Sequence, residues 1–242
     1  RQTSSWVFDP SYSGQARVPQ NAIEPLPLNV RKFIGRRAVQ EVYAGCVVNL
    51  GTGIPNDVIG NISNEEGINN DIMITVESGI YGGVQAGGID FGIGRNLYAM
   101  IGHHEQMDYY NGAGVDITFM GFGELDGEGN INATKMGPRC TGCGGFIDIT
   151  QNAKKVVFCG TFTAGGCEFS FENQRLTIVK EGRIRKMVGR AAQYSFNGKL
   201  AREKSQEVYV VTERAVFKLV PEGVMLTEIA PGIDLKTQVL DL

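Results

Sequence analysis

The feature that most limits the fold of this chain is a strand, a glycine turn, a helix and a second strand in direct succession. The apolar run Cys46–Leu50 predicts a buried strand, and Gly51–Pro55 follows it as a tight turn. Pro55 suits the first turn of a helix, which we expect from about 55 to 65. Because Asp71–Val76 is a second apolar strand, the whole is a βαβ unit with parallel strands. The sequence therefore predicts an α/β fold with an open, mostly parallel sheet.

The segment before this unit has a different character. Residues 1–28 are rich in proline and polar residues, and we interpret them as a linker arm that arrives from an upstream half. Residues 29–242 are then the domain itself. Apolar residues at helical spacing predict an amphipathic helix from about 29 to 44, which Gly45 ends.

The segment after Ser78 is punctuated by glycine. The chain has 33 glycines in 242 residues, which is about twice the average usage. They lie inside hydrophobic stretches, so we expect tight turns and sites lined by backbone. This portion should be richer in β-structure, with a hairpin at Asp126-Gly127 and strands at 115–120, 155–159, 207–211 and 214–219.

Charge and hydropathy exclude several classes of protein. The net charge of −3 lacks the basic excess of a nucleic-acid binder. No run approaches the 18 apolar residues of a membrane span, and the first residues do not resemble a signal peptide. A basic run contains Arg183, Arg185, Lys186 and Arg190. It could meet phosphate groups electrostatically, but a solvated face is the commoner explanation, and we leave the run unassigned. No nucleic-acid or membrane partner is expected.

The cysteines indicate a reducing compartment. The chain has five cysteines, an odd number, and it is long enough to bury a hydrophobic core without disulfides, so a disulfide framework is not expected. Cys140-x-x-Cys143 lacks two further ligands at zinc-site spacing, since His103 and His104 are adjacent to each other. We interpret the cysteines as small buried thiols and expect no metal. The cytoplasm is the expected location, with the mitochondrial matrix as the alternative.

The βαβ unit allows a first functional interpretation, which is dinucleotide binding. Gly51-x-Gly53 follows a strand and opens a helix, and Glu77 ends the next strand, where an acid would bind a ribose. However, Asn56 occupies the position of the third glycine of that motif. An NAD(P)-dependent oxidoreductase domain is therefore the alternative rather than the main hypothesis.

A second interpretation starts from Glu77 itself. It ends an apolar strand and is followed at once by Ser78-Gly79 and a glycine-rich run. Ligands meet a parallel sheet at the carboxyl ends of its strands, so a glutamate there can act as a carboxylate nucleophile. A single glutamate at a strand end is more often a solvated charge, and further motifs must support the hypothesis.

Such motifs occur along the whole chain from about Asp9 onward. In their order and spacing they resemble the catalytic half of the family I coenzyme A transferases, in particular the propionate or short-chain acyl CoA-transferase branch. The three main motifs are Asn49–Pro55, Glu77–Gly79 and Gly142–Asp148, and three further segments support them: Gly83–Gly92, Gln151–Thr163 and Val211–Phe217.

The resemblance implies transfer of CoA between a short-chain acyl-CoA and a carboxylate acceptor by a ping-pong mechanism. Glu77 would be the nucleophile and would carry a glutamyl-CoA thioester, and the backbone of Gly145 would stabilise the oxyanions. Further contacts with the substrate or CoA would come from Gly51, Gly53, Ile54, Ser78, Gly79 and Gly144. CoA would be substrate and covalent intermediate, with no permanently bound cofactor.

The resemblance also implies a partner. Family members need two homologous halves, and the N-terminal half, which supplies much of the CoA site, is not part of this sequence. We therefore expect a homologous N-terminal CoA-binding half, in the same gene or as a separate chain, and a homo- or hetero-oligomer. A non-catalytic subunit that keeps the fold is a further alternative.

Overall fold

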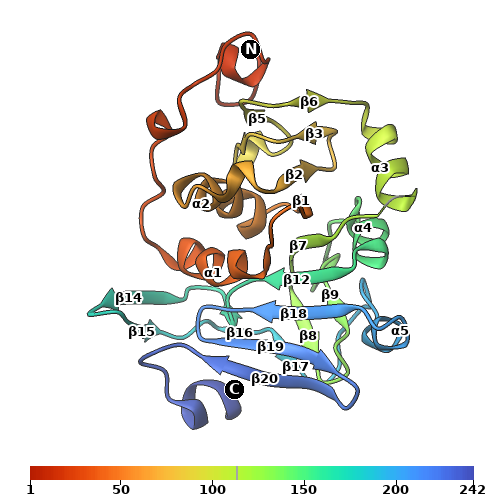
Figure 1. Ribbon diagram of the computed structural model, residues 1–242. Helices are drawn as coiled ribbons and strands as arrows, with labels where there is room; N and C mark the ends of the chain where they lie inside the picture. Colours follow the sequence, from red (N-terminus) through yellow and green to blue (C-terminus); the bar gives the residue numbers. More distant parts are fainter. Residues whose placement is uncertain (113) are drawn as a thin grey trace.

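The computed structural model describes residues 1–112 and 114–242, and a large sheet organises them (Figure 1). In this described part, nine strands are ordered β20-β19-β18-β12-β7-β1-β2-β3-β6. The five strands from β18 to β2 are parallel, and the two strands at each edge are antiparallel to their neighbours. The α/β class and the mostly parallel sheet predicted from the sequence are confirmed.

The strands of the large sheet are short. Their bounds are β1 Val47–Leu50, β2 Met73–Val76, β3 Ile80–Tyr81, β6 Ala99–Met100, β7 Ile117–Gly121, β12 Lys155–Cys159, β18 Glu207–Val211, β19 Ala215–Val220 and β20 Gly223–Ile229. Smaller sheets pair β4 Val84–Gln85 with β5 Gly94–Arg95, β10 Lys135–Met136 with β11 Arg139–Cys140, β13 Thr163–Ala164 with β16 Ile184–Arg185, β14 Glu168–Glu172 with β15 Arg175–Lys180, and β8 Glu124–Asp126 with both β9 Ile131–Asn132 and β17 Met187–Val188.

Helices cover both faces of the parallel strands. Buried residues of α1 (Val30–Ala38) and α2 (Gly60–Glu65) belong to the core on one face. Buried residues of α3 (His103–Gly112), α4 (Phe146–Asn152) and α5 (Gly198–Glu203) belong to the core on the other. Shorter helical turns span Pro10–Tyr12, Gln20–Ala22, Val39–Glu41, Pro55–Ile59, Ile68–Asn70, Gly88–Asp90 and Lys236–Leu240.

The central strand β12 shows why these segments read as continuous apolar runs. Val157 and Cys159 pack in the core beneath α1 and α2, whereas Val156 and Phe158 pack in the core beneath α4 and α5. Because successive side chains point to opposite faces and both faces are covered, every position after Lys155 is buried. The strand consequently lacks the polar alternation of a half-exposed sheet.

The expected elements are found with small differences in length. The strands and the helix of the βαβ unit are present, and β1 and β2 are parallel. The first helix is shorter than the expected 29–44, because the chain tightens to one turn at Val39–Glu41 and Val42 is already extended. Such tightening at the last turn is common at helix ends. The expected hairpin forms from β8 and β9.

Residues 1–28 run along the outside of the domain (Figure 1). Hydrogen bonds between their backbone and side chains of the domain hold them there. Val18 N donates to Asn96 Oδ1, and Asn96 Nδ2 donates to Val18 O. Leu26 N donates to Glu65 Oε1. That this segment is a linker stays a prediction. None of the helices in the described part of the chain has the length and apolar character that crossing a bilayer requires.

Candidate active site

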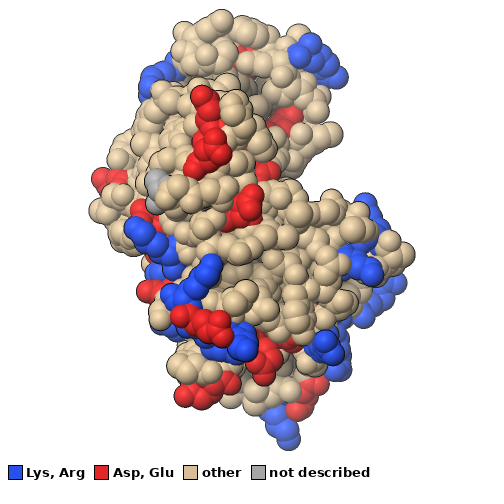
Figure 2. All heavy atoms as spheres, turned by 90° about the vertical axis from the view of Figure 1, so that its right-hand side faces the viewer, with Lys and Arg blue, Asp and Glu red and all other residues tan. Residues whose placement is uncertain are grey.

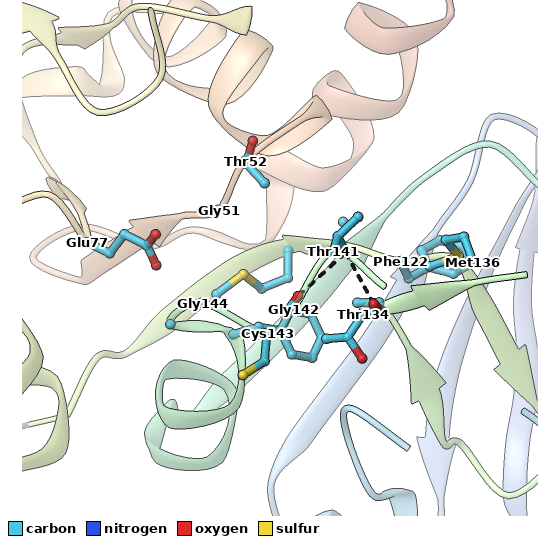
Figure 3. A pocket seen from close by; sticks show the side chains of 16 residues that line it. Gly51, Thr52, Glu77, Phe122, Thr134, Met136, Thr141, Gly142, Cys143 and Gly144 are labelled. Atoms are coloured by element: carbon cyan, nitrogen blue, oxygen red, sulfur yellow. Dashed lines mark hydrogen bonds between the residues drawn. The ribbon is translucent and has the colours of Figure 1, made fainter. Parts of the chain in front are cut away.

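Glu77 lies in the turn that joins β2 to the antiparallel strand β3. The turn is tight because Gly79 adopts a φ of +101° and a Cβ there would clash with the carbonyl oxygen of Ile101. Ser78 Oγ donates a hydrogen bond of 2.9 Å to the Gly92 carbonyl and so ties the turn to the following loop. The Glu77 side chain is left to extend over the end of the parallel strands (Figure 3).

Gly145 lies directly against the Glu77 carboxylate. A Cβ built on Gly145 would clash with Glu77 Oε2 and would lie 3.4 Å from Glu77 Cδ. The φ of Gly145 is −78°, which any residue adopts, so glycine is needed here for space and not for backbone freedom. In the same loop Gly142 and Gly144 have positive φ values of +79° and +50°. Thus the structure brings Glu77 into contact with Gly145, which is 68 residues further along the chain.

The two segments border a cavity of about 390 Å³. Figure 3 shows Gly51 and Thr52 on one side and the loop Gly142–Gly144 on the other. Large apolar side chains supply much of the remaining wall. The lining residues are Gly51, Thr52, Glu77, Met120, Gly121, Phe122, Gly123, Ala133, Thr134, Met136, Thr141, Gly142, Cys143, Gly144, Gly145 and Phe146.

The turn after β1 meets the cavity at only one of its predicted residues. Gly51 lines it, and a Cβ there would clash with Met120 Sδ. Gly51 N also donates a 2.8 Å hydrogen bond to Phe119 O of the adjacent strand β7. Gly53 and Ile54 do not line the cavity, and neither do Ser78 and Gly79.

Several lining residues were missed by the sequence reasoning, chiefly the apolar ones. Met120 is the last residue but one of β7, which pairs with β1 in the sheet, and Phe122 follows the strand. The rule that sites gather at the carboxyl ends of neighbouring parallel strands could have found both. Met136 lies on the hairpin β10–β11, and nothing in the sequence indicates that this hairpin folds over the cavity.

A buried polar layer supports the site from below. Thr75, Asn49 and Thr118 lie side by side in the register of β2, β1 and β7. Asn49 Nδ2 donates to Thr118 Oγ1 at 2.9 Å, and Tyr110 OH donates to Asn49 Oδ1 at 2.9 Å. Burial raises the pKa of Tyr110, which keeps its hydroxyl protonated as a donor. Since Glu77 is two residues beyond Thr75, the turn that carries it follows directly on this hydrogen-bonded layer.

The Glu77 carboxylate is not neutralised by a neighbour. Among residues 1–112 and 114–242 it forms no hydrogen bond or ion pair, and Figure 3 shows none to the side chains around it. The buried Lys186 packs instead on Phe122, which lines the cavity, with Nζ 3.6 Å from the centroid of the Phe122 ring. Glu77 is therefore available as a nucleophile toward a molecule in the cavity.

A solvated face does not account for one member of the basic run. Lys186 is only 6% exposed, whereas Arg183, Arg185 and Arg190 are exposed. Its ammonium group packs on an aromatic ring, and this packing explains the burial.

The cysteines also differ from the expectation of buried thiols. Cys46 and Cys159 are buried, but Cys140 and Cys143 are exposed and Cys167 is half-buried. Cys140 lies on β11 and Cys143 lies in the loop Gly142–Gly145. The glycines of this loop have no side chains that could cover the two thiols. Among the residues that the structure describes, no three His, Cys, Asp or Glu side chains gather as metal ligands would.

Comparison with known proteins identifies the family, although no family model matches the sequence. The chain is 44% identical to caffeate CoA-transferase from Acetobacterium woodii, over 99% of this chain and 46% of that protein. It is 28% identical to the beta subunit of acetate CoA-transferase from Haemophilus influenzae, over 87% of this chain and 88% of the subunit.

A solved structure agrees with these relatives. The apoenzyme of the acyl-CoA transferase YdiF from Escherichia coli O157:H7 matches with a TM-score of 0.88 and 38% identity, over 98% of this chain and 44% of that one. A thioester complex of the same protein with CoA matches with a TM-score of 0.83. The chain belongs to the family I CoA-transferases, as a chain similar to their beta subunit. It spans less than half the length of caffeate CoA-transferase and of YdiF.

Proposed function

We propose that the protein containing this chain transfers CoA between a short-chain acyl-CoA and a carboxylate acceptor. The observation that carries the proposal is the unpaired carboxylate of Glu77, which faces the Gly145 backbone at an apolar cavity. The names of the relatives support the reaction class, and the YdiF thioester complex supports a thioester intermediate. Neither a nicotinamide cofactor nor a purely structural role requires this arrangement.

In the proposed mechanism a Glu77 oxygen attacks the thioester carbonyl of the donor. The C–S bond breaks, leaving an acyl-glutamyl anhydride and the CoA thiolate. The thiolate then attacks the glutamyl carbonyl, which releases the donor carboxylate and leaves a glutamyl-CoA thioester. An acceptor carboxylate repeats both steps in reverse and regenerates Glu77. The anhydride conserves the activation of the thioester, so no other energy source is needed.

Each step forms a tetrahedral oxyanion beside Gly145. We assign the Gly145 N–H as its hydrogen-bond donor, because no side chain separates this backbone from the Glu77 carboxylate. Gly51 and Gly144 would contact the substrate through their backbones. Gly53, Ile54, Ser78 and Gly79 would hold the two turns behind the wall.

The active protein should contain more than this chain. Because relatives such as caffeate CoA-transferase are more than twice as long, we propose that a homologous N-terminal CoA-binding half completes the site in an oligomer. The match to a beta subunit supports a second half in the same or a separate chain. The exposed thiols of Cys140 and Cys143 favour a reducing compartment, the cytoplasm or the mitochondrial matrix.

Isotope exchange tests this function in the full-length protein. A ping-pong mechanism through Glu77 predicts that labelled acetate enters acetyl-CoA without any second acceptor. Glu77→Gln should abolish the exchange, whereas Glu203→Gln, at an exposed glutamate of α5, should leave it unchanged. Transfer that requires both substrates at once, with no exchange, would contradict the proposal.

A further inference from the structure

The hairpin β10–β11 forms one side of the catalytic cavity. Met136, on its first strand, lines the cavity, and so does Thr141, which directly follows the second strand. Met136 packs so closely on Gly123 that a Cβ at Gly123 would clash with its methyl group. The face of the hairpin that carries Met136 is therefore the face that looks into the cavity.

The register of the hairpin assigns its two cations to opposite faces. Met136 pairs with Arg139, and Lys135 pairs with Cys140. Directly paired residues of antiparallel strands project from the same face. Arg139 is thus on the cavity face, in the same pair as the lining residue Met136 and next to the hairpin tip, while Lys135 is on the outer face. Of the four paired residues only Met136 lines the cavity, so Arg139 lies beside the lining on the same face.

Arg139 has no partner for its charge. Its side chain is exposed, and it joins no ion pair or hydrogen bond with other residues in the described ranges 1–112 and 114–242. Arg37 and Arg202, by contrast, are held by carboxylates: Arg37 binds Glu228 at 2.6 Å and Arg202 binds Glu128 at 3.2 Å. A free guanidinium group at the rim of a cavity can bind an anion that enters or leaves it.

The size of the cavity indicates which anion this is. Drug-sized ligands fill sites of about 300–1,000 Å³, and CoA is larger than such ligands. A cavity of about 390 Å³ holds the acyl group and the thiol end of the pantetheine arm, so the nucleotide end must pass the rim. Figure 2 also shows a notch in the outline, with Lys and Arg gathered along the edge below it.

We propose that Arg139 binds the phosphate groups of CoA at the rim of the catalytic cavity. The inference rests on the proposed function, because it takes CoA as the substrate. Arg is suited to this contact, since its planar guanidinium group can donate two parallel hydrogen bonds to one phosphate. Lys135 provides a matched control: it is a cation of the same hairpin with its side chain on the other face.

Calorimetric titration of the full-length protein with free CoA tests this assignment. Arg139→Gln should weaken CoA binding about tenfold, as expected for one charge-assisted contact. It should leave the binding of pantetheine, which lacks all phosphates, unchanged. Lys135→Gln should change neither affinity by more than about twofold. Added salt should weaken CoA binding to the unsubstituted protein more than to Arg139→Gln.

Dephospho-CoA locates the contact within the nucleotide. If Arg139→Gln weakens CoA but not dephospho-CoA, the contact is with the 3′-phosphate; if it weakens both, the contact is with the diphosphate. Equal CoA affinities of Arg139→Gln and the unsubstituted protein would overturn the assignment, and so would equal losses for CoA and pantetheine. Both outcomes are distinct from failure of the proposed function, which would appear as an absence of isotope exchange in the unsubstituted protein.

Discussion

Glu77 and Glu213 both follow parallel strands of the same sheet, but the chain surrounds them differently. Glu77 follows β2, is half-buried and faces the cavity without a partner. Glu213 lies two residues beyond β18 and is fully buried. Its Oε1 accepts a 2.7 Å hydrogen bond from Arg214 Nε, and its Oε2 accepts one of 2.8 Å from Phe162 N.

The comparison shows what separates a reactive carboxylate from a structural one. The charge of Glu213 is compensated by a buried arginine that also binds Glu181 at 2.8 Å. Glu77 instead has glycine backbone around it, so its oxygens remain free to attack. Both glutamates lie at the carboxyl edge of the sheet. They differ in whether other groups bind their carboxylate oxygens, and this difference decides their roles. A substitution at Glu77 should therefore lower activity without lowering stability, and a substitution at Glu213 should lower stability with little change in activity.

The largest expected effect is on catalysis at Glu77. Glu77→Gln should lower CoA transfer by about 10⁴-fold or more, because an amide is too weak a nucleophile to open a thioester. Its thermal unfolding should match that of the unsubstituted protein, since no ion pair is lost. Steady-state kinetics and calorimetry of the same preparation check both statements. Residual transfer within tenfold of normal would remove the distinction between the two glutamates.

The second effect is on stability at Glu213. Glu213→Gln should lower the free energy of unfolding by about 3–5 kcal/mol, because it leaves the buried Arg214 without one of its two carboxylates. Denaturant titration measures this, and the rate per folded molecule should change little. A stable variant with lost transfer would mean that Glu213, and not only Glu77, belongs to the reaction.

A smaller catalytic effect is expected at Gly145. Gly145→Ala should lower turnover by about 10²–10³-fold, because the added methyl clashes with Glu77 Oε2 and tilts the donor peptide. Gly189→Ala adds the same methyl where no atom lies within 4 Å and serves as the control. Turnover number and CoA-ester affinity should be measured separately. If affinity collapses while turnover survives, Gly145 belongs to binding and not to oxyanion stabilisation.

The smallest effect concerns Lys186, whose charge is influenced by Glu213. Burial lowers the pKa of Lys186 to about 8, from an ordinary value of 10.5. Between pH 8 and 10.5 the Lys186 side chain holds a proton in the unfolded chain that it has lost in the folded chain, so the contribution of this residue to stability should rise with pH across this window. The gain should approach about 3 kcal/mol. Lys186→Met should lack this rise, and equal pH profiles of both proteins would contradict it.

The sequence predicted the Glu77 region well for physical reasons. A buried parallel strand needs a continuous apolar run, and Ile72–Val76 provides one that ends at the glutamate. The glycine loop at 142–145 was found through its resemblance to a family, and its contact with Glu77 depends on the packing of α4 beside the sheet. Local pattern alone contains no such information.

The Glu213 region could not be predicted in the same way. Glu213-Arg214 after a strand is typical of a solvated turn, and its burial depends on the C-terminal segment, where Gln238 O accepts a 3.0 Å hydrogen bond from Arg214. Lys186 was hidden within a basic run for a similar reason. Its burial requires Gly160, where a Cβ would lie 2.6 Å from its Nζ and 2.7 Å from Phe122 Cε1. Such long-range contacts leave no local signature.

The most direct test of the account is the site of covalent attachment. The full-length protein should be exposed to acyl-CoA without an acceptor, the thioester reduced with borohydride, and the peptides analysed by mass spectrometry. The account predicts one modified glutamate within residues 71–82, at Glu77, and no modification in Glu77→Gln. An adduct on Cys143, which also lines the cavity, would contradict it, because that would indicate acyl transfer through a thiol.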